Sequence, residues 1–227
     1  MKILSGQPPF PSVFKQLNMT TYRFNDIANL RQEIAIAAAR MIAEEGSSYD
    51  VAKRKAARMI LGNSRITGEI LPDNPTIENE VRLYNALFRS DTQPARLLYL
   101  RHLSLGLMKK LAPFNPYITG AILNGTGGEH SDIHLQLFTD NAKDVEIFLL
   151  NNDIDFNVSE SPQSRGKHSS REIIHFIWHD ETVHLAVYDP DDIRRPDKFF
   201  GHHHERANLN ELQRLVYPAD TDTENKF

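Results

Sequence analysis

The sequence predicts an α+β fold, in which an N-terminal helical bundle precedes a mixed or antiparallel sheet. Apolar residues recur at intervals of three and four from Asn25 to Leu111, which is the spacing of amphipathic helices. Pro113 and Pro116 then interrupt this pattern. Beyond them, apolar and polar residues alternate as they do in strands. Because the helices come first and the strands later, the chain is expected to be α+β and not alternating α/β.

The helical half is divided by residues that start and stop helices. Asn25 or Asp26 can cap the start of the first helix, and Gly46 fits its end. The proline of Thr92-Gln93-Pro94 is tolerated in the first turn of the last helix of this half. The expected helices of this half are 25–46, 50–61, 77–88 and 92–111.

The second half is expected to build a sheet with helices on one face. Its second strand would place Ile133, Leu135 and Leu137 on one side and Asp132 and His134 on the other. Residues 179–181 have the length of a hairpin connection between two later strands. The expected strands are 117–123, 132–138, 154–158, 172–178 and 182–188, with helices at 141–151 and 208–216.

These patterns divide the chain into regions. The prediction comprises a surface extension (1–24), a helical region (25–112), an α+β region (113–217) and a disordered tail (218–227).

Composition narrows the classes of protein. A formal net charge of −4 gives no global case for nucleic-acid binding. The absence of cysteine excludes disulfides and thiolate metal sites. No apolar run is long enough to span a bilayer, and prolines interrupt the N-terminus where a signal peptide would be apolar. We therefore expect a cytoplasmic protein without a membrane partner.

A glycine-rich stretch between two expected strands is the strongest candidate site. Asn124-Gly125-Thr126-Gly127-Gly128 precedes Ser131-Asp132-Ile133-His134. Glycines allow close backbone approach to a ligand and expose N–H groups that bind anions. Asp132 and His134 are two residues apart on a strand, so both side chains point to the same face. A carboxylate and an imidazole are thus predicted beside an anion-binding turn.

The order of these elements resembles the nucleotidyltransferase superfamily of the DNA polymerase beta type. In that family a glycine turn after the first strand contacts nucleotide phosphates, the next strand carries Asp-X-Asp, and a later strand carries a third acid. Gly125-Thr126 resembles the turn, and Ser131-Asp132-Ile133-His134-Leu135 resembles Ser-Asp-Ile-Asp-Leu. Val183-His184-Leu185 resembles the strand with the third acid. The resemblance covers Tyr117 to Asp189.

The resemblance implies roles for particular residues. Asp132, His134 and His184 would occupy the catalytic positions of the acidic triad. Nucleotide phosphates would meet the turn, formed by Gly125, Thr126, Gly127, Gly128 and Ser131. An active enzyme would use Mg²⁺ or Mn²⁺, and its substrate would be a nucleoside triphosphate. This sequence departs from the family pattern, because two histidines stand where the family has acids. Imidazole suits transition metals better than Mg²⁺, so the departure changes which metal the site would prefer.

Three interpretations follow from this departure. The first is a divergent, inactive nucleotidyltransferase-like protein that binds a nucleotide or a protein partner, including a second copy of itself. The second is an active metal-dependent enzyme that transfers a nucleotidyl group to an unknown acceptor, with Glu129, Glu172 or Asp189 supplementing Asp132. The third is a mononuclear transition-metal site.

The mononuclear site would use Asp132, His134 and His184, with His130 as a fourth ligand if the turn folds back.

Further candidates come from basic residues and histidines elsewhere. RNA could bind to the basic residues Lys53, Arg54, Lys55 and Arg58. Phosphates could meet Lys143, Lys167 and Arg171. A metal could be bound by His202, His203 and His204.

Overall fold

The computed structural model describes residues 19–62, 66–161, 171–194 and 205–218, and it confirms the α+β prediction. The helices are α1 (Met19–Glu45), α2 (Tyr49–Leu61), α3 (Asn74–Phe88), α4 (Gln93–Lys110), α5 (Ala121–Asn124), α6 (Ala142–Asn151) and α7 (Leu209–Val216), with 3-10 turns η1 (Ala112–Phe114) and η2 (Pro190–Arg194). The strands are β1 (Pro116–Thr119), β2 (Ile133–Phe138), β3 (Phe156–Ser161), β4 (Arg171–Trp178), β5 (Glu181–Tyr188) and β6 (Arg206–Ala207). Among the described residues, no helix combines the length and apolarity needed to cross a membrane.

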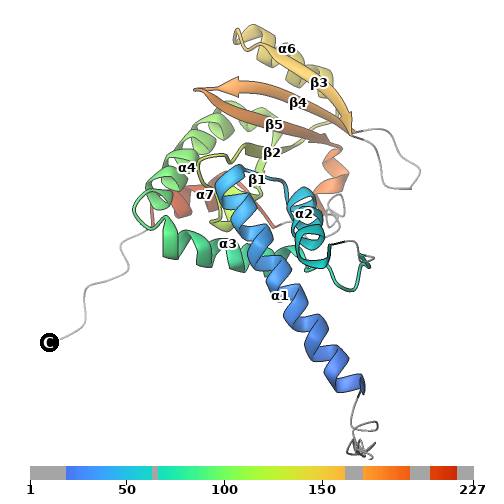
Figure 1. Ribbon diagram of the computed structural model, residues 1–227. Coiled ribbons are helices and arrows are strands. Elements are labelled where there is room, and N and C mark those ends of the chain that lie inside the picture. The colour runs from blue at the N-terminus through green and yellow to red at the C-terminus, as the bar shows by residue number, and fades with distance from the viewer. Residues whose placement is uncertain (1–18, 63–65, 162–170, 195–204, 219–227) are drawn as a thin grey trace, which may run out of the picture.

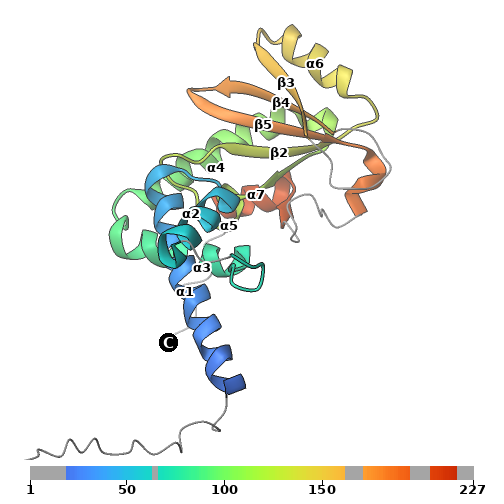
Figure 2. The same ribbon diagram turned by 45° about the vertical axis from the view of Figure 1, so that its right-hand side comes forward.

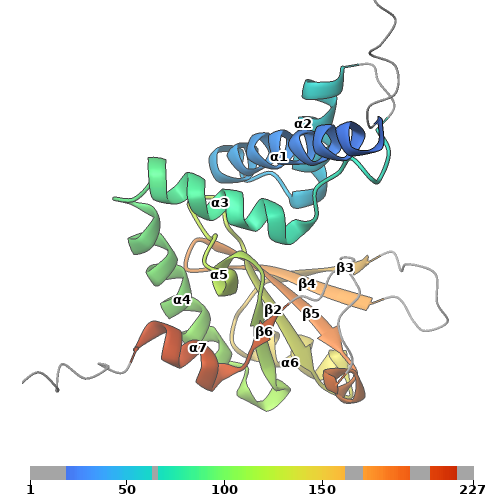
Figure 3. The same cartoon turned by 90° about the horizontal axis from the view of Figure 1, so that it is seen from below.

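Helices α1, α2 and α3 form a core of their own, on one side of the sheet (Figure 3). Ile34 and Ala38 of α1 are fully buried against Ala52 and Ala56 of α2 and Ile77 of α3. Burying alanine at these contacts costs no side-chain conformational entropy, and its small size lets the helices approach closely.

Helix α1 begins at Met19 and not at Asn25, so the predicted extension was too long. Residues 19–24 contain neither glycine nor proline, so nothing in them stops the helix from extending toward the N-terminus. Residues 1–18 lie outside the described part of the chain.

Gly46 ends α1 in the left-handed conformation, as the sequence predicted, with φ +67°. A Cβ atom there would lie 2.5 Å from the Cβ of His130. Gly46→Ala is therefore expected to lower the free energy of unfolding by about 1–2 kcal/mol, because it adds a positive-φ penalty and a clash. Urea denaturation would measure this loss. Gly62→Ala tests the backbone penalty without a clash, because Gly62 also has a positive φ, +59°, and has open space around it.

In the sheet the strand order is β3-β4-β5-β2-β1-β6. Figures 1 and 2 show β3, β4, β5 and β2 side by side in this order. Strands β2 and β5 pair in parallel, and the other neighbours are antiparallel. Ile133, Leu135 and Leu137 are buried in one core with α4, α6 and α7, as the alternation predicted. The opposite face of β2 carries the exposed His134.

Strand β1 ends at Thr119, so the predicted strand over 117–123 was too long. Gly120 adopts φ +76° and leads directly into the short helix α5, in which Ile122 is buried. Glycine adopts a positive φ without steric strain, and this conformation ends the extended strand. The turn that ends the first strand is therefore at Gly120, five residues before Gly125.

The β4–β5 hairpin turns through two residues, His179 and Asp180, and not through three. Both have positive φ, at +49° and +66°. Two successive positive φ values are those of a type I′ turn, which matches the twist of the paired strands. This turn pairs Trp178 with Glu181 and therefore sets His175 opposite His184.

Candidate metal centre

A row of polar residues crosses the sheet on the face opposite the helix-packed core. Residues that pair in register project from the same face, so their side chains are neighbours. In spatial order from β3 to β6 the row consists of Asn157, His175, His184, His134, Thr119 and Arg206. Three histidines on adjacent strands thus lie side by side.

Asp132, His134 and His184 converge where the start of β2 lies beside the middle of β5. One ligand atom of each side chain lies within 4.8 Å of the corresponding atoms of the other two. Nε2 of His184 is 3.0 Å from Oδ2 of Asp132. The rings of His134 and His184 are stacked, with centroids 4.7 Å apart and planes 13° from parallel. The structure therefore brings together the three residues that the sequence placed in the catalytic and metal positions.

A chain of hydrogen bonds continues from this cluster toward the edge of the sheet. Nδ1 of His184 is 2.7 Å from Nδ1 of His175. Nε2 of His175 is in turn 2.6 Å from Oγ of Ser159 on strand β3. The rings of His175 and His184 meet edge to face, with centroids 4.9 Å apart. Asp132, His184, His175 and Ser159 are thus connected across four strands or strand ends.

The surroundings shift the pKa values of Asp132 and of His175, the histidine beside the cluster. The hydrogen bond with His184 lowers the pKa of the Asp132 carboxyl below its ordinary value, so this group is ionised at neutral pH. Partial burial lowers the pKa of His175, and the neighbouring His184 lowers it further. His175 is consequently neutral near pH 7.

His130 does not join the cluster formed by Asp132, His134 and His184 in the described part of the chain. Its Cβ lies against Gly46 at the end of α1, and the residue is exposed.

The other acids proposed as supplements also lie elsewhere. Glu172 is on β4 with the parity of the buried Ile174, so it faces away from His175. Glu129 is exposed, and its carbonyl accepts a hydrogen bond from Arg96. Asp189, which follows β5, accepts a hydrogen bond from the backbone N–H of Asp191.

The turn 125–128 is held by bonds within the chain. The backbone N–H of Thr126 donates to Oδ1 of Asn124, that of Gly127 to the carbonyl of Ala121, and that of Gly128 to Oγ of Ser131. Thr126 is buried. As folded, the turn does not present these three N–H groups to a phosphate.

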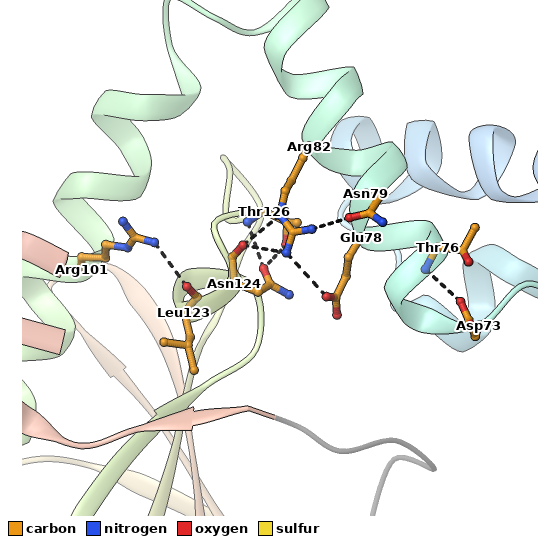
Figure 4. Close-up of polar contacts among 9 residues, drawn as sticks. All are labelled: Asp73, Thr76, Glu78, Asn79, Arg82, Arg101, Leu123, Asn124 and Thr126. Atoms are coloured by element: carbon orange, nitrogen blue, oxygen red, sulfur yellow. Dashed lines mark hydrogen bonds and ion pairs between the residues drawn. The ribbon is translucent and has the colours of Figure 1, made fainter. Parts of the chain in front are cut away.

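The carbonyls around this turn attach it to the helical region (Figure 4). Nε and Nη2 of Arg82 on α3 both lie 3.1 Å from the carbonyl oxygen of Asn124. Arg101 on α4 donates to the carbonyls of Ile122 and Leu123. Gln93 donates to Gly125 and Gly127. The glycine-rich stretch therefore joins α3 and α4 to the sheet.

The basic cluster on α2 is not a uniform exposed patch. Lys53 is buried, and burial lowers its pKa. Lys55 forms an ion pair with Glu45 at 2.7 Å. Elsewhere, Lys143 pairs with Glu146 on α6. Lys167 and the residues His202, His203 and His204 lie outside the described residues.

His175, Ser159 and Gly120 are site or turn residues that sequence reasoning missed. The signal for His175 lay in the hairpin, because a two-residue turn at 179–180 pairs residue 175 with residue 184. The signal for Gly120 was a glycine directly after the β-branched pair Ile118-Thr119.

Comparisons of the chain with protein-family models, curated proteins and solved structures found no match.

Proposed function

We propose that the protein binds one divalent transition-metal ion through Asp132, His134 and His184. The observation that carries this proposal is the convergence of one carboxylate and two imidazoles, with their ligand atoms within 4.8 Å of one another. Ligands about 2.0–2.2 Å from a shared ion lie roughly 3–3.5 Å apart at tetrahedral or octahedral angles. The 3.0 Å between Asp132 and His184 is already in this range.

The ligand chemistry favours a transition metal over Mg²⁺. Two neutral imidazoles and one carboxylate suit Zn, Fe, Ni or Cu, whereas Mg²⁺ prefers an all-oxygen environment. Three protein ligands leave a coordination position open for water or a substrate, as in catalytic sites. The half-exposed carboxylate of Asp132, with 45% of its side chain accessible, is compatible with access from solvent.

Isothermal titration of the metal-free protein with Zn²⁺ tests this proposal. We expect one ion per chain and a raised melting temperature, because an ion that binds only the folded state stabilises it. Elemental analysis of protein purified without chelator would identify the ion carried from the cell. Absence of stoichiometric binding of Zn²⁺, Co²⁺, Fe²⁺, Ni²⁺ or Cu²⁺ would contradict the proposal.

A second candidate is nucleotide binding on a nucleotidyltransferase-like sheet, with or without transfer. Two observations favour it. Strand β2 lies between β1 and β5, and His134 pairs with His184 in parallel register, where the family resemblance places two acids. Gly120 and α5 follow β1, which leaves room for a helical turn before Asp132. Gly120-Ala121 therefore matches the position of the family turn better than Gly125-Thr126 does.

Labelled nucleoside triphosphates, supplied with Mg²⁺, Mn²⁺ or Zn²⁺ in cell extract, test transfer. Labelling of an acceptor by the wild type and not by Asp132→Ala would support activity. Equilibrium dialysis with the same nucleotides tests binding alone, which is the result expected of an inactive protein. If neither nucleotide binding nor labelling is seen, this second candidate is excluded.

A further inference from the structure

We propose that His175, supported by Ser159, is a positioning residue that commits Nε2 of His184 to the metal. The inference depends on the metal site proposed above and gives roles to two residues beside it. His184 has two ring nitrogens, and either could bind an ion. Nδ1 is engaged by His175 at 2.7 Å, so only Nε2, on the side of Asp132, is directed toward the other ligands. A metal-bound histidine usually donates its second N–H to a fixed partner, and His175 supplies that partner.

The metal-free chain of hydrogen bonds has a definite direction. An ionised carboxylate can only accept, so Nε2–H of His184 donates to Asp132. Nδ1 of His184 then has a lone pair and accepts from Nδ1–H of His175. Nε2 of His175 in turn accepts from the hydroxyl of Ser159. Each neutral imidazole carries one proton in this arrangement.

Metal binding at Nε2 of His184 reverses the bonds without changing the number of protons. With its lone pair on the ion, Nε2 carries no proton, and Nδ1–H of His184 donates to Nδ1 of His175. Nε2–H of His175 then donates to Oγ of Ser159, which keeps its own hydrogen. Each ring moves its proton to its other nitrogen, and the atoms connected by hydrogen bonds stay the same. This tautomer exchange distinguishes a positioning role from ordinary packing.

The sheet holds His184 in the orientation that this exchange requires. Its ring is stacked on His134 on one side and meets His175 edge to face on the other. His134 and His175 belong to the two strands that flank β5, and the hairpin at 179–180 fixes the register of one pair. Turning the ring over by 180° would keep its plane stacked on His134, but it would break the hydrogen bonds of Nδ1 to His175 and of Nε2 to Asp132.

Nitrogen-15 NMR of the histidine rings, with and without Zn²⁺, tests the proposal directly. We expect protonated Nε2 on His184 and protonated Nδ1 on His175 without metal, and the opposite pair when Zn²⁺ is bound. Zn²⁺ binding by the wild type with unchanged tautomers would overturn the inference and leave the metal site standing. Failure of the wild type to bind any of the transition metals tested would instead refute the proposed function.

Variants at position 175 provide a second measurement. His175→Leu should weaken Zn²⁺ binding by about 10–100-fold, the usual effect of losing a ligand's outer partner. His175→Asn keeps an amide oxygen near Nδ1 to accept from His184 and should recover most of the affinity. Ser159→Ala should give a smaller loss. Asn157→Ala, a neighbour in the same row, is the matched control and should bind as the wild type does. Equal affinity in His175→Leu and the wild type would overturn the inference.

Discussion

Replacing His184 by alanine is expected to weaken Zn²⁺ binding by more than about a hundredfold, equivalent to about 2.7 kcal/mol. The substitution removes one of the three ligands and also the group that orients Asp132 through the 3.0 Å contact. His134→Ala removes a ligand from an exposed position and should give a loss of similar size. Titration with Zn²⁺ by calorimetry would measure both.

The control for this experiment is a histidine outside the cluster. His102 is exposed on α4, where its Nδ1 contacts the carbonyl of Leu98 within the same helix. His102→Gln should bind Zn²⁺ with the affinity of the wild type. Circular dichroism should show that all three variants are folded, because His184 and His134 lie on the face of the sheet opposite the buried core and His102 is exposed on α4. Wild-type affinity in both His184→Ala and His134→Ala would contradict the assignment of the ligands.

Asp132→Asn separates charge from shape at the same site. The amide keeps the size of the carboxylate and can still accept a hydrogen bond from His184, but it is a much poorer metal ligand. We expect the fold to be retained and Zn²⁺ affinity to fall by about tenfold or more, by loss of the anionic ligand. An affinity unchanged from that of the wild type would mean that Asp132 orients His184 and does not itself bind the ion.

The placement of Asp132 and His134 on one face could be predicted because it depends only on the alternation along residues 132–138, the strand that the sequence predicted. The buried positions Ile133, Leu135 and Leu137 fix which face is inward. Bringing His184 beside them requires a parallel pairing of two strands far apart in the chain. Local periodicity contains no information about such a pairing, and the family resemblance supplied it.

His175 was missed because of a one-residue error in a turn. A connection of three residues, 179–181, would pair Trp178 with Thr182 and set His175 opposite the buried Leu185. The observed two-residue turn pairs His175 with His184 instead. Positive φ at His179 and Asp180 is uncommon for non-glycine residues, and no glycine in the sequence marks the shorter turn. An error of one residue in the pairing register assigns each side chain to the wrong face of the sheet, so every cross-strand partner is predicted wrongly.

Glu181→Ala is expected to lower the free energy of unfolding by about 3 kcal/mol. This is the largest loss of stability that we predict for a single substitution in this protein. Arg96 of α4 meets the Glu181 carboxylate through two parallel hydrogen bonds of 2.6 and 2.7 Å. Only 21% of the Arg96 side chain and 13% of the Glu181 side chain are accessible. Removing the carboxylate therefore leaves a largely buried guanidinium without its partner.

The same pair connects the helical region to both strands of the metal site. Arg96 also donates to the carbonyl of Glu129, three residues before Asp132, while Glu181 lies three residues before His184. Loss of the pair should consequently loosen the relative placement of Asp132 and His184, and Zn²⁺ affinity should fall together with stability. Urea denaturation and calorimetry on the same preparation would measure the two effects.

A double-mutant cycle distinguishes the ion pair from simple loss of side-chain volume. Glu181→Gln keeps the shape and one acceptor, so it should cost less than Glu181→Ala. Combining Glu181→Gln with Arg96→Met removes both charges, and the double variant should be more stable than the sum of the single effects predicts, because no buried charge is left unpaired. Strictly additive losses, or a Glu181→Ala variant within about 0.5 kcal/mol of the wild type, would show that solvent screens the pair. In that case the connection between α4 and the metal site would depend on Gln93 and Arg101, whose bonds to the segment 122–127 remain intact in every variant of the cycle.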